Sequence, residues 1–373
     1  MTGRERLERT FDGLPVDRIP LTTLVDDITR KNMPEEYRNI TPIEFYHKMG
    51  YEVLQFGDYG MPEHLWTIPP YEIRTGYTVE RETRGKLYIE RRILNGEALE
   101  IHIADNHPVK HPVTTEEELE LLCRMWESVE VIELTGEALQ KSIESYRRMD
   151  EAIGDIGIFV PTVDQSGVQH LLEYEMGLEN FYYLLEDAPE LVERAIEAVQ
   201  KERRVKYELL AKHLDFIKTV IPIENTSSLL ISPKLYRKYT LPHMQEYARI
   251  MHKYGKKAVI HMCGALLALL PELKEVGLDG IHGLTPPPIG TCPYEAALDA
   301  LGEDLIVLTT YGTEYLRDDA LTDEEKRECM RRELTPRIKA GNFIFGLVSD
   351  GMETDLSLFE FVRDVHAEFG TNP

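Results

Sequence analysis

The 373-residue sequence contains few cysteines, no long apolar run and fewer positive than negative charges. Its four cysteines, at positions 123, 263, 292 and 329, do not suggest a disulfide framework, so we expect reduced thiols in a reducing compartment. No apolar stretch approaches the roughly 18–20 residues of a membrane span. The charged start MTGRERLERTFDGLP lacks the apolar centre of a signal peptide. These absences favour a cytoplasmic protein that does not cross a membrane.

The charge balance also restricts the classes of partner. Lys and Arg number 42 and Asp and Glu number 66, which gives a formal net charge of -24. Such a surface repels nucleic acid and anionic membranes, so we expect neither as a partner. The sequence has no Gly/Ser-rich linker, and apolar residues make up 42% of it, enough for a sizeable core. We therefore predict a single domain over residues 1–373.

Short apolar runs alternate along the chain with longer segments of helical periodicity. The runs are rich in Val, Ile and Leu without clean polar alternation, which is typical of parallel strands buried on both faces. They cover residues 18–24, 52–57, 156–163, 215–223, 257–262, 277–284, 305–312 and 343–349. Eight such strands with helices between them predict an α/β fold, a closed (β/α)8 TIM barrel, although an open doubly wound sheet also fits the pattern.

One region departs from this alternation. Residues 76–106 alternate polar and apolar side chains with a period of two, and Arg84-Gly85 and Asn95-Gly96 are typical hairpin turns. We therefore predict an antiparallel β-hairpin subregion, residues 67–110, inserted near the N-terminal third of the barrel. Helix starts are indicated by Ser232 followed by proline, and by Thr114 or Thr115 before an acidic first turn.

The stretch KAVIHMCGA, residues 257–265, carries the clearest chemical signal. His261 and Cys263 are two residues apart, so on a strand their side chains would share a face. At the carboxyl end of a barrel strand both would reach the mouth, where such enzymes build their active sites. Imidazole nitrogen and thiolate sulfur together suit zinc. The alternative is a packed histidine beside an inert buried cysteine.

A third ligand would have to come from another strand end. Glu224 and Asp350 each close an apolar run with a carboxylate, which is unusual without a function or a buried partner. His282 closes another run, and Cys292 lies in a loop from which it could approach. Cys123 is better explained as a core residue, and Cys329 as a half-buried residue of a charged helix.

Four residues at predicted strand ends are candidates for substrate contact, and each has a structural alternative. Asp58 could instead close a turn, and Asp164 could cap a helix. His282 could be a structural histidine with its hydrogen bonds satisfied. Tyr311 could pack within the barrel with its hydroxyl bonded locally.

Several stretches resemble the uroporphyrinogen decarboxylase superfamily. They are the start RERLERTFDGLPVDRIPL, the central ENTSSLLISPKLYRKYTLPHMQEYARIMHKYGKKAVIHMCG and the ending KAGNFIFGLVSDG. The resemblance covers nearly the whole chain apart from the β insertion. It implies a (β/α)8 barrel, in agreement with the strand count.

The superfamily divides by chemistry. Its decarboxylases bind polycarboxylate substrates and carry an arginine-rich motif after the first strand. Here that place reads TTLVDDITRKNMPEEY, with two aspartates and a single arginine, so porphyrinogen decarboxylation is disfavoured. The corrinoid-dependent methyltransferases look like zinc enzymes with a His-x-Cys pair and a later cysteine near the last strand. His261 and Cys263 match the pair, but Ser349 and Asp350 stand where the later cysteine is expected.

The resemblance therefore implies an O-demethylase type of corrinoid methyltransferase. A methyl group would pass from an O-methyl substrate, such as a methoxylated aromatic, to cob(I)alamin on a separate corrinoid protein. The expected cofactors are Zn²⁺ and the partner's corrinoid. The expected metal ligands are His261, Cys263, Glu224 and Asp350, and the first three are also the expected catalytic residues. One zinc with a single thiolate would act as a Lewis acid on the ether oxygen.

Other functions stay open at this point. One is a methyltransferase that carries methyl from a methylcobamide to a thiol or another acceptor. A second is a decarboxylase, and a third is a non-catalytic barrel that binds a corrinoid or a metal. The oligomeric state also stays open, with a homodimer as one alternative.

Overall fold

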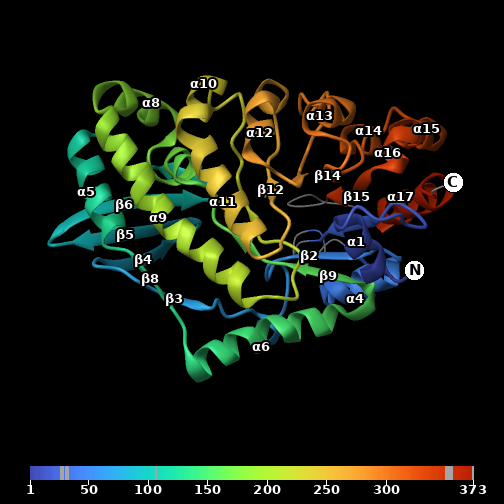
Figure 1. Ribbon diagram of the computed structural model, residues 1–373, viewed down its shortest axis with the longest axis horizontal. Coiled ribbons are helices and arrows are strands. Elements are labelled where there is room, and N and C mark those ends of the chain that lie inside the picture. The colour runs from blue at the N-terminus through green and yellow to red at the C-terminus, as the bar shows by residue number, and fades with distance from the viewer. Residues whose placement is uncertain (26–28, 30–32, 106, 349–355, 372–373) are drawn as a thin grey trace.

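The computed structural model describes residues 1–25, 29, 33–105, 107–348 and 356–371. Parallel strands lie at its centre, and helices cover them (Figure 1). No helix in these residues is both long enough and apolar enough to cross a membrane.

The parallel strands follow the order of the predicted runs, each of which contains at least one strand. They are β1 (Leu21–Leu24), β2 (Val53–Phe56), β9 (Gly157–Val160), β10 (Thr162–Val163), β11 (Ile221–Pro222), β12 (Val259–His261), β13 (Gly280–His282), β14 (Ile306–Leu308) and β15 (Asn342–Val348). Except for β15, which starts one residue before its run and has the same length, the observed strands are shorter than the runs, because the runs include loop residues next to each strand. The α/β class with parallel strands is confirmed.

Pairing passes from strand to strand in chain order. One sheet runs β12-β13-β14-β15-β1, and β2 pairs with β9, and β10 with β11, all in parallel. A bridge between Ile223 and His261 links β11 to β12, and the Glu52 amide donates to the Leu21 carbonyl between β2 and β1. This order is the one expected for a (β/α)8 barrel.

Helices of different lengths connect the strands. The longer ones are α1 (Gly3–Phe11), α4 (Pro42–Met49), α5 (Glu116–Glu127), α6 (Gly136–Ile153), α8 (Gly177–Asp187), α9 (Pro189–His213), α11 (Leu241–Lys253), α12 (Leu270–Val276), α13 (Tyr294–Leu301), α15 (Asp323–Glu333) and α17 (Leu356–Phe369). The short ones are α3 (Glu35–Arg38), η1 (Glu63–Leu65), η2 (Gly154–Ile156), α7 (Gly167–His170), η3 (Leu171–Glu175), α10 (Pro233–Leu235), η4 (Tyr236–Thr240), η5 (Leu267–Leu269), α14 (Thr313–Leu316) and α16 (Pro336–Ala340). Ser232 and Thr115 cap α10 and α5, as the sequence predicted.

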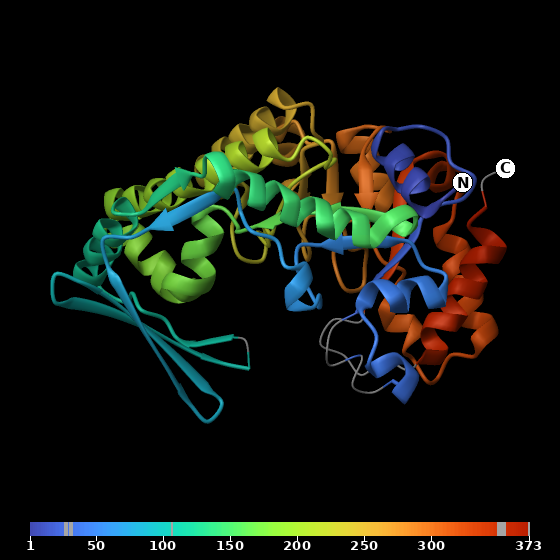
Figure 2. The ribbon, with the colours of Figure 1, turned by 90° about the horizontal axis from the view of Figure 1, so that it is seen from below.

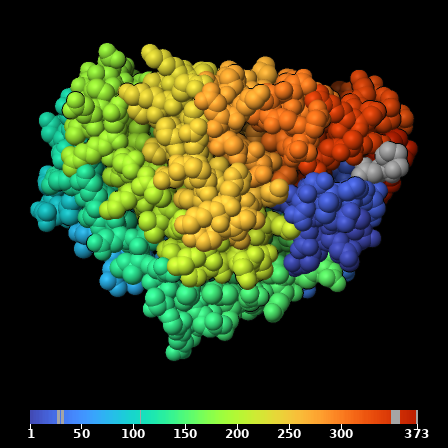
Figure 3. All heavy atoms as spheres, in the orientation of Figure 1, coloured from blue at the N-terminus to red at the C-terminus, as the bar shows by residue number. Residues whose placement is uncertain are grey.

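Apolar side chains fill the space between the parallel strands at the amino ends of the strands. Their inward side chains form a buried apolar cluster with Leu7 and Phe11 of α1. Helix α1 lies near the amino ends of the strands, since Lys218, just before β11, pairs with Asp12 directly after α1. Figure 3 shows this N-terminal segment packed beside the C-terminal part of the chain. The carboxyl ends are consequently free to form a pocket.

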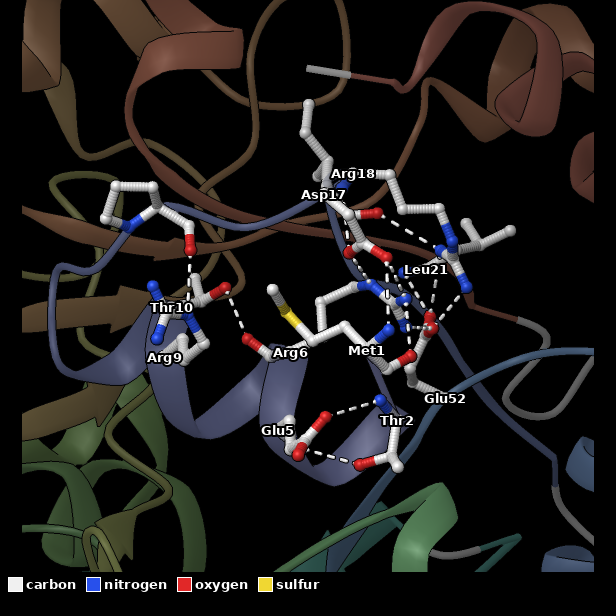
Figure 4. A network of polar contacts seen from close by, with 12 residues as sticks. Met1, Thr2, Glu5, Arg6, Arg9, Thr10, Asp17, Arg18, Leu21 and Glu52 are labelled. Atoms are coloured by element: carbon white, nitrogen blue, oxygen red, sulfur yellow. Dashed lines mark hydrogen bonds and ion pairs between the residues drawn. The ribbon is translucent and has the colours of Figure 1, made fainter.

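A network of ion pairs fixes α1 to the strands (Figure 4). The Glu52 carboxylate, 3% exposed, accepts from Arg6 at 2.6 Å and from the Leu21 amide at 2.8 Å. Arg18 donates to both of its oxygens, and Arg6 also pairs with Asp17. Because Glu52 leads into β2 and Leu21 begins β1, this network holds the first two strands together.

The inserted region forms a separate antiparallel sheet in the order β4 (Thr78–Arg84), β5 (Leu87–Leu94), β6 (Glu97–Ala104) and β7 (His107–Lys110). The turn between β5 and β6 is Asn95-Gly96, with both φ angles positive at 53° and 89°. Strand β3 (Tyr71–Arg74) pairs with β8 (Glu130–Glu133) alongside it. Figure 2 shows the four-stranded sheet projecting from the body of the molecule.

Candidate active site at the carboxyl ends of the strands

A cavity of about 310 Å³ lies at the carboxyl ends of the parallel strands. Apolar walls come from β1, β2, β14, β15 and one loop: Leu24, Leu54, Phe56, Ile289, Leu308, Ile344 and Leu347. Threonine side chains and two separate glycines, Gly283 after β13 and Gly346 in β15, supply most of the remaining lining. The titratable residues among the described lining residues are His261, Cys263 and His282, and no arginine or lysine contributes. The cavity therefore suits an uncharged, largely apolar ligand.

His261 and His282 meet in this cavity. They end neighbouring strands in register, and their Nδ1 atoms lie 2.7 Å apart. Burial lowers the pKa of His261 to about 4 and also lowers that of His282. Both imidazoles are therefore neutral at neutral pH and able to offer a lone pair. The sequence analysis placed His282 among the substrate contacts and among the alternative sources of a third ligand, and the structure puts it directly against His261.

Cys263 lies just beyond the end of β12 and lines the same cavity. Its side chain is exposed, and its Sγ lies 3.6 Å from Oδ1 of Asn225. Neighbouring protein atoms withdraw part of its solvation, which raises the pKa of the thiol, and the charge of Glu173 acts in the same direction. The thiol is therefore protonated at neutral pH unless a cation binds it.

Glu224 points away from the cavity, into the wall between the strands and the helices. It is 0% exposed, and its carboxylate accepts from the Ser166 amide at 2.7 Å and the Ser166 hydroxyl at 3.0 Å. The Thr226 hydroxyl donates to it as well. Burial raises the pKa of Glu224 above its usual value. The adjacent Ile223 faces the inner cluster, so Glu224, next along the strand, faces the opposite way.

The structure gives Asp58 and Asp164 partners within the protein. Asp58 accepts from the amide and hydroxyl of Thr67, which closes the loop after β2, and burial raises its pKa. Asp164 accepts from Lys206 at 2.7 Å and pairs with Arg203. Burial opposes its ionisation, but the two cations outweigh that effect and lower the pKa of Asp164. Neither carboxylate lines the cavity of His261.

Tyr311 and Cys292 lie in the packing around the site. Tyr311 is 0% exposed, stacks on Phe345 and bonds through its hydroxyl to Nδ1 of His366. Cys292 is buried, with Sγ near the Pro293 carbonyl. All four cysteines are free, and Cys123 is a core residue as predicted.

Phe56 is a residue that the sequence analysis missed. Its ring stacks on His282 with centroids 4.5 Å apart and an interplanar angle of 27°. The pattern contained the signal, since Leu54 and Phe56 alternate along one strand and so share a face. Gly283 is a second such residue, because its φ is +82° and a Cβ there would come 3.0 Å from Cε1 of His261.

The donor atoms in the cavity are of the types that zinc prefers. The described residues, as arranged, do not form a complete metal site. Two imidazoles and a thiol are borderline-soft ligands of the sort zinc prefers. Within the described part of the chain, no three His, Cys, Asp or Glu side chains stand close enough together to hold a metal ion as arranged. Asp350, a predicted ligand, lies outside the described residues.

Comparison with known proteins supports the predicted resemblance. Residues 109–284 match the family model described as uroporphyrinogen decarboxylase (URO-D). The whole fold is similar to a solved methyltransferase from Methanosarcina mazei, with a TM-score of 0.57, 13% sequence identity and coverage of 99% of both chains. No curated protein matches the sequence.

The predicted resemblance to the uroporphyrinogen decarboxylase superfamily is thus confirmed. The matched region runs from the last strand of the inserted sheet to the loop after β13, and it contains both His261 and His282. At 13% identity, the likeness to the methyltransferase concerns the fold alone.

Proposed function

We propose that this protein is a corrinoid-dependent methyltransferase that takes a methyl group from a small, uncharged O-methyl substrate, such as a methoxylated aromatic. The acceptor is cob(I)alamin on a separate corrinoid protein. Cobalt(I) supplies the electron pair of the new Co–C bond, the C–O bond breaks with its electron pair on oxygen, and the oxygen takes up a proton from water on release. The observation that carries the proposal is the cavity of about 310 Å³, which combines apolar walls with His261, His282 and Cys263.

The lining of this cavity separates the proposal from decarboxylation. A substrate with several carboxylates needs guanidinium or ammonium groups to replace its hydration. The described lining residues include neither, but offer Phe56, Leu308 and Ile344 to a flat apolar ring. The solved structure with a similar fold is a methyltransferase, which is in line with this choice.

The chain's own residues orient the substrate and exclude water. The apolar walls desolvate the ring and so restrict where the methyl carbon can lie, which raises the effective concentration of the reacting groups. In this proposal His261 and Cys263 hold a zinc ion, and Asp350 is a further candidate ligand. Zinc, when bound, supplies a Lewis acid for the ether oxygen. Glu224 is left out of the ligand set, because its oxygens are occupied by Ser166 and Thr226.

The corrinoid protein would have to approach from the carboxyl ends of the strands, where the cavity lies. The projecting sheet β4–β7 is our candidate for part of its docking surface. It carries exposed charges of both signs, including Arg84 and Glu82. A mixed surface of this kind would orient a partner by charge complementarity.

The proposal is tested by incubating purified, zinc-loaded protein with cob(I)alamin and a panel of methoxylated aromatics. Formation of methylcob(III)alamin is followed by absorbance, and the demethylated phenol by chromatography. We expect His261→Ala and Cys263→Ala to lower the rate by about a hundredfold or more, the scale on which loss of charge stabilisation acts. Cys329→Ala is the matched control, since Cys329 lies on α15 away from the cavity.

Three results would contradict this assignment. Methylation of thiols from methylcob(III)alamin, without ether cleavage, would favour the reverse direction of transfer. Carbon dioxide release from a carboxylate substrate would favour a decarboxylase. Tight corrinoid binding without turnover of any substrate would favour a binding protein.

A further inference from the structure

The contact between His261 and His282 is built from three different strands. The two histidines end β12 and β13 at the same register position, and their Nδ1 atoms face each other at 2.7 Å. Phe56 of β2 stacks on the outer side of the His282 ring, which fixes its plane. Gly283 leaves the room that the His261 ring occupies, since a side chain there would touch it. The His282 ring is therefore held between Phe56 and His261.

Two facing imidazole nitrogens need a positive centre between them, because their lone pairs repel each other. A shared proton fills that role in the described arrangement, as one Nδ1–H donates to the other Nδ1. A metal ion can fill it as well. Two nitrogen ligands on a tetrahedral zinc stand about 3.3 Å apart, given Zn–N distances of about 2.0–2.1 Å. The pair would have to separate by only about 0.6 Å to admit the ion.

We propose that His282 is a metal ligand, and that His261, His282 and Cys263 together hold the zinc ion. This inference rests on the proposed function and replaces Glu224 by a nitrogen donor from the neighbouring strand. The Nδ1 atoms of both histidines bind the metal, and Cys263 turns from Asn225 to supply the sulfur. The weak contact of 3.6 Å between Sγ and the Asn225 oxygen offers little resistance to that rotation.

The ligand set decides the charge of the site. With these three ligands alone, two neutral imidazoles and one thiolate, the zinc site carries a net charge of about +1, whereas a carboxylate such as Asp350 or Glu224 in place of His282 would neutralise it. A net positive centre in an apolar cavity attracts electron density from a neutral oxygen more strongly. The His282 assignment therefore agrees with an uncharged ether as substrate.

The ligand assignment is tested with cobalt(II) in place of zinc, on wild type and on His282→Ala. The visible bands of cobalt(II) report the ligands around the metal, and a competing chelator gives the affinity. We expect His282→Ala to change the visible bands and to weaken binding by more than the about 10–100-fold typical of residues outside the coordination shell. His47→Ala is the matched control, because His47 is an exposed histidine of α4, and it should change neither.

An unchanged cobalt spectrum in a folded His282→Ala variant would overturn the inference, whatever the affinity. X-ray absorption of zinc-loaded wild type gives the same answer without any variant. Two imidazoles and one sulfur on zinc would support the assignment, and a single imidazole would overturn it. If wild type cleaves ethers while either of these contrary results is found, only the His282 assignment fails. If wild type binds metal through both histidines but transfers no methyl group, the proposed function fails instead.

Discussion

Replacing Glu224 separates the structural role of this residue from the ligand role that the sequence suggested. The carboxylate is fully buried, and both of its oxygens accept hydrogen bonds from Ser166 or Thr226. Ser166 is also the N-cap of α7, so the Glu224 carboxylate fixes the start of that helix. We therefore expect Glu224→Ala to destabilise the fold while leaving the metal site intact.

The magnitude follows from the groups that lose their acceptor. The Ser166 amide would be left buried and unsatisfied, at a cost of about 1–3 kcal/mol. Two hydroxyl donors would also lose their partner, and the missing atoms would leave a small cavity, which together add about 2 kcal/mol. The free energy of unfolding should fall by about 3–5 kcal/mol in total.

Denaturant unfolding followed by circular dichroism measures this change, and elemental analysis of the folded variant measures zinc. The control is Glu328→Ala, since Glu328 lies on the surface of α15, and its effect should stay within about 0.5 kcal/mol. Loss of zinc from a Glu224→Ala variant of nearly wild-type stability would refute the reasoning, because it would place the carboxylate at the metal.

Glu224→Gln adds a test of the pKa. Burial raises the folded-state pKa of Glu224 above the ordinary 4.5, so the folded protein holds this proton more tightly than the unfolded chain does. The contribution of Glu224 to stability is then complete below about pH 4.5 and declines as pH rises towards the folded-state pKa. The amide cannot ionise, so the stability of Glu224→Gln relative to wild type should improve with rising pH. A constant difference from pH 4 to pH 8 would contradict the raised pKa.

Three further predictions concern other parts of the molecule. Arg92→Ala leaves the buried Glu175 carboxylate without its bidentate partner and should lower the free energy of unfolding by about 3–5 kcal/mol. Arg84→Ala, which breaks an exposed ion pair, should lower it by less than about 0.5 kcal/mol, and equal effects of the two substitutions would contradict the burial argument. Burial raises the pKa of Glu333 to about 7, so the free energy of unfolding should fall as pH rises from about 4.5 to 7. Glu333→Gln should recover about 3 kcal/mol at pH 8 but little at pH 4, as measured by urea unfolding. Phe56→Ala removes an aromatic wall of the cavity and should raise the KM for an aromatic ether about three- to tenfold, as measured by steady-state kinetics. An unaltered KM would contradict this role of Phe56.

Local sequence pattern was sufficient for the strands and for several turns. Each apolar run contains a parallel strand because a chain segment buried on both faces must be apolar on both. The Asn95-Gly96 turn was predictable for a similarly local reason, since only such residues readily accept two successive positive φ angles. Helix starts such as Ser232 depend on a side chain bonding to an amide three residues away, which is also a local matter.

The positions of the carboxylates depended on tertiary structure. Glu224 lies at the end of its strand, as the sequence suggested. Which way its side chain points depends on which face of the strand that position occupies, and on its hydrogen bonds to Ser166, 58 residues earlier in the chain. Asp164 likewise has cationic partners on α9, which no local pattern could reveal. A carboxylate at a strand end can face the interior or the helices, and only the packed neighbours determine which.

By itself, the sequence determined the class of fold, the place of the two ligand types in His261 and Cys263, and the resemblance to the superfamily. The fold class and the place of the two ligands follow from period and local spacing, which short-range physics controls. The resemblance rests instead on the three stretches of sequence that the chain shares with the superfamily. The tertiary structure decided that His282 lies against His261 and that Phe56 stacks on His282. The first contact depends on the register between two successive strands, and the second joins strands that are far apart in the chain. Pairing of β12 with β13 and the approach of β2 across the interior bring those side chains together, and no single segment of sequence specifies either.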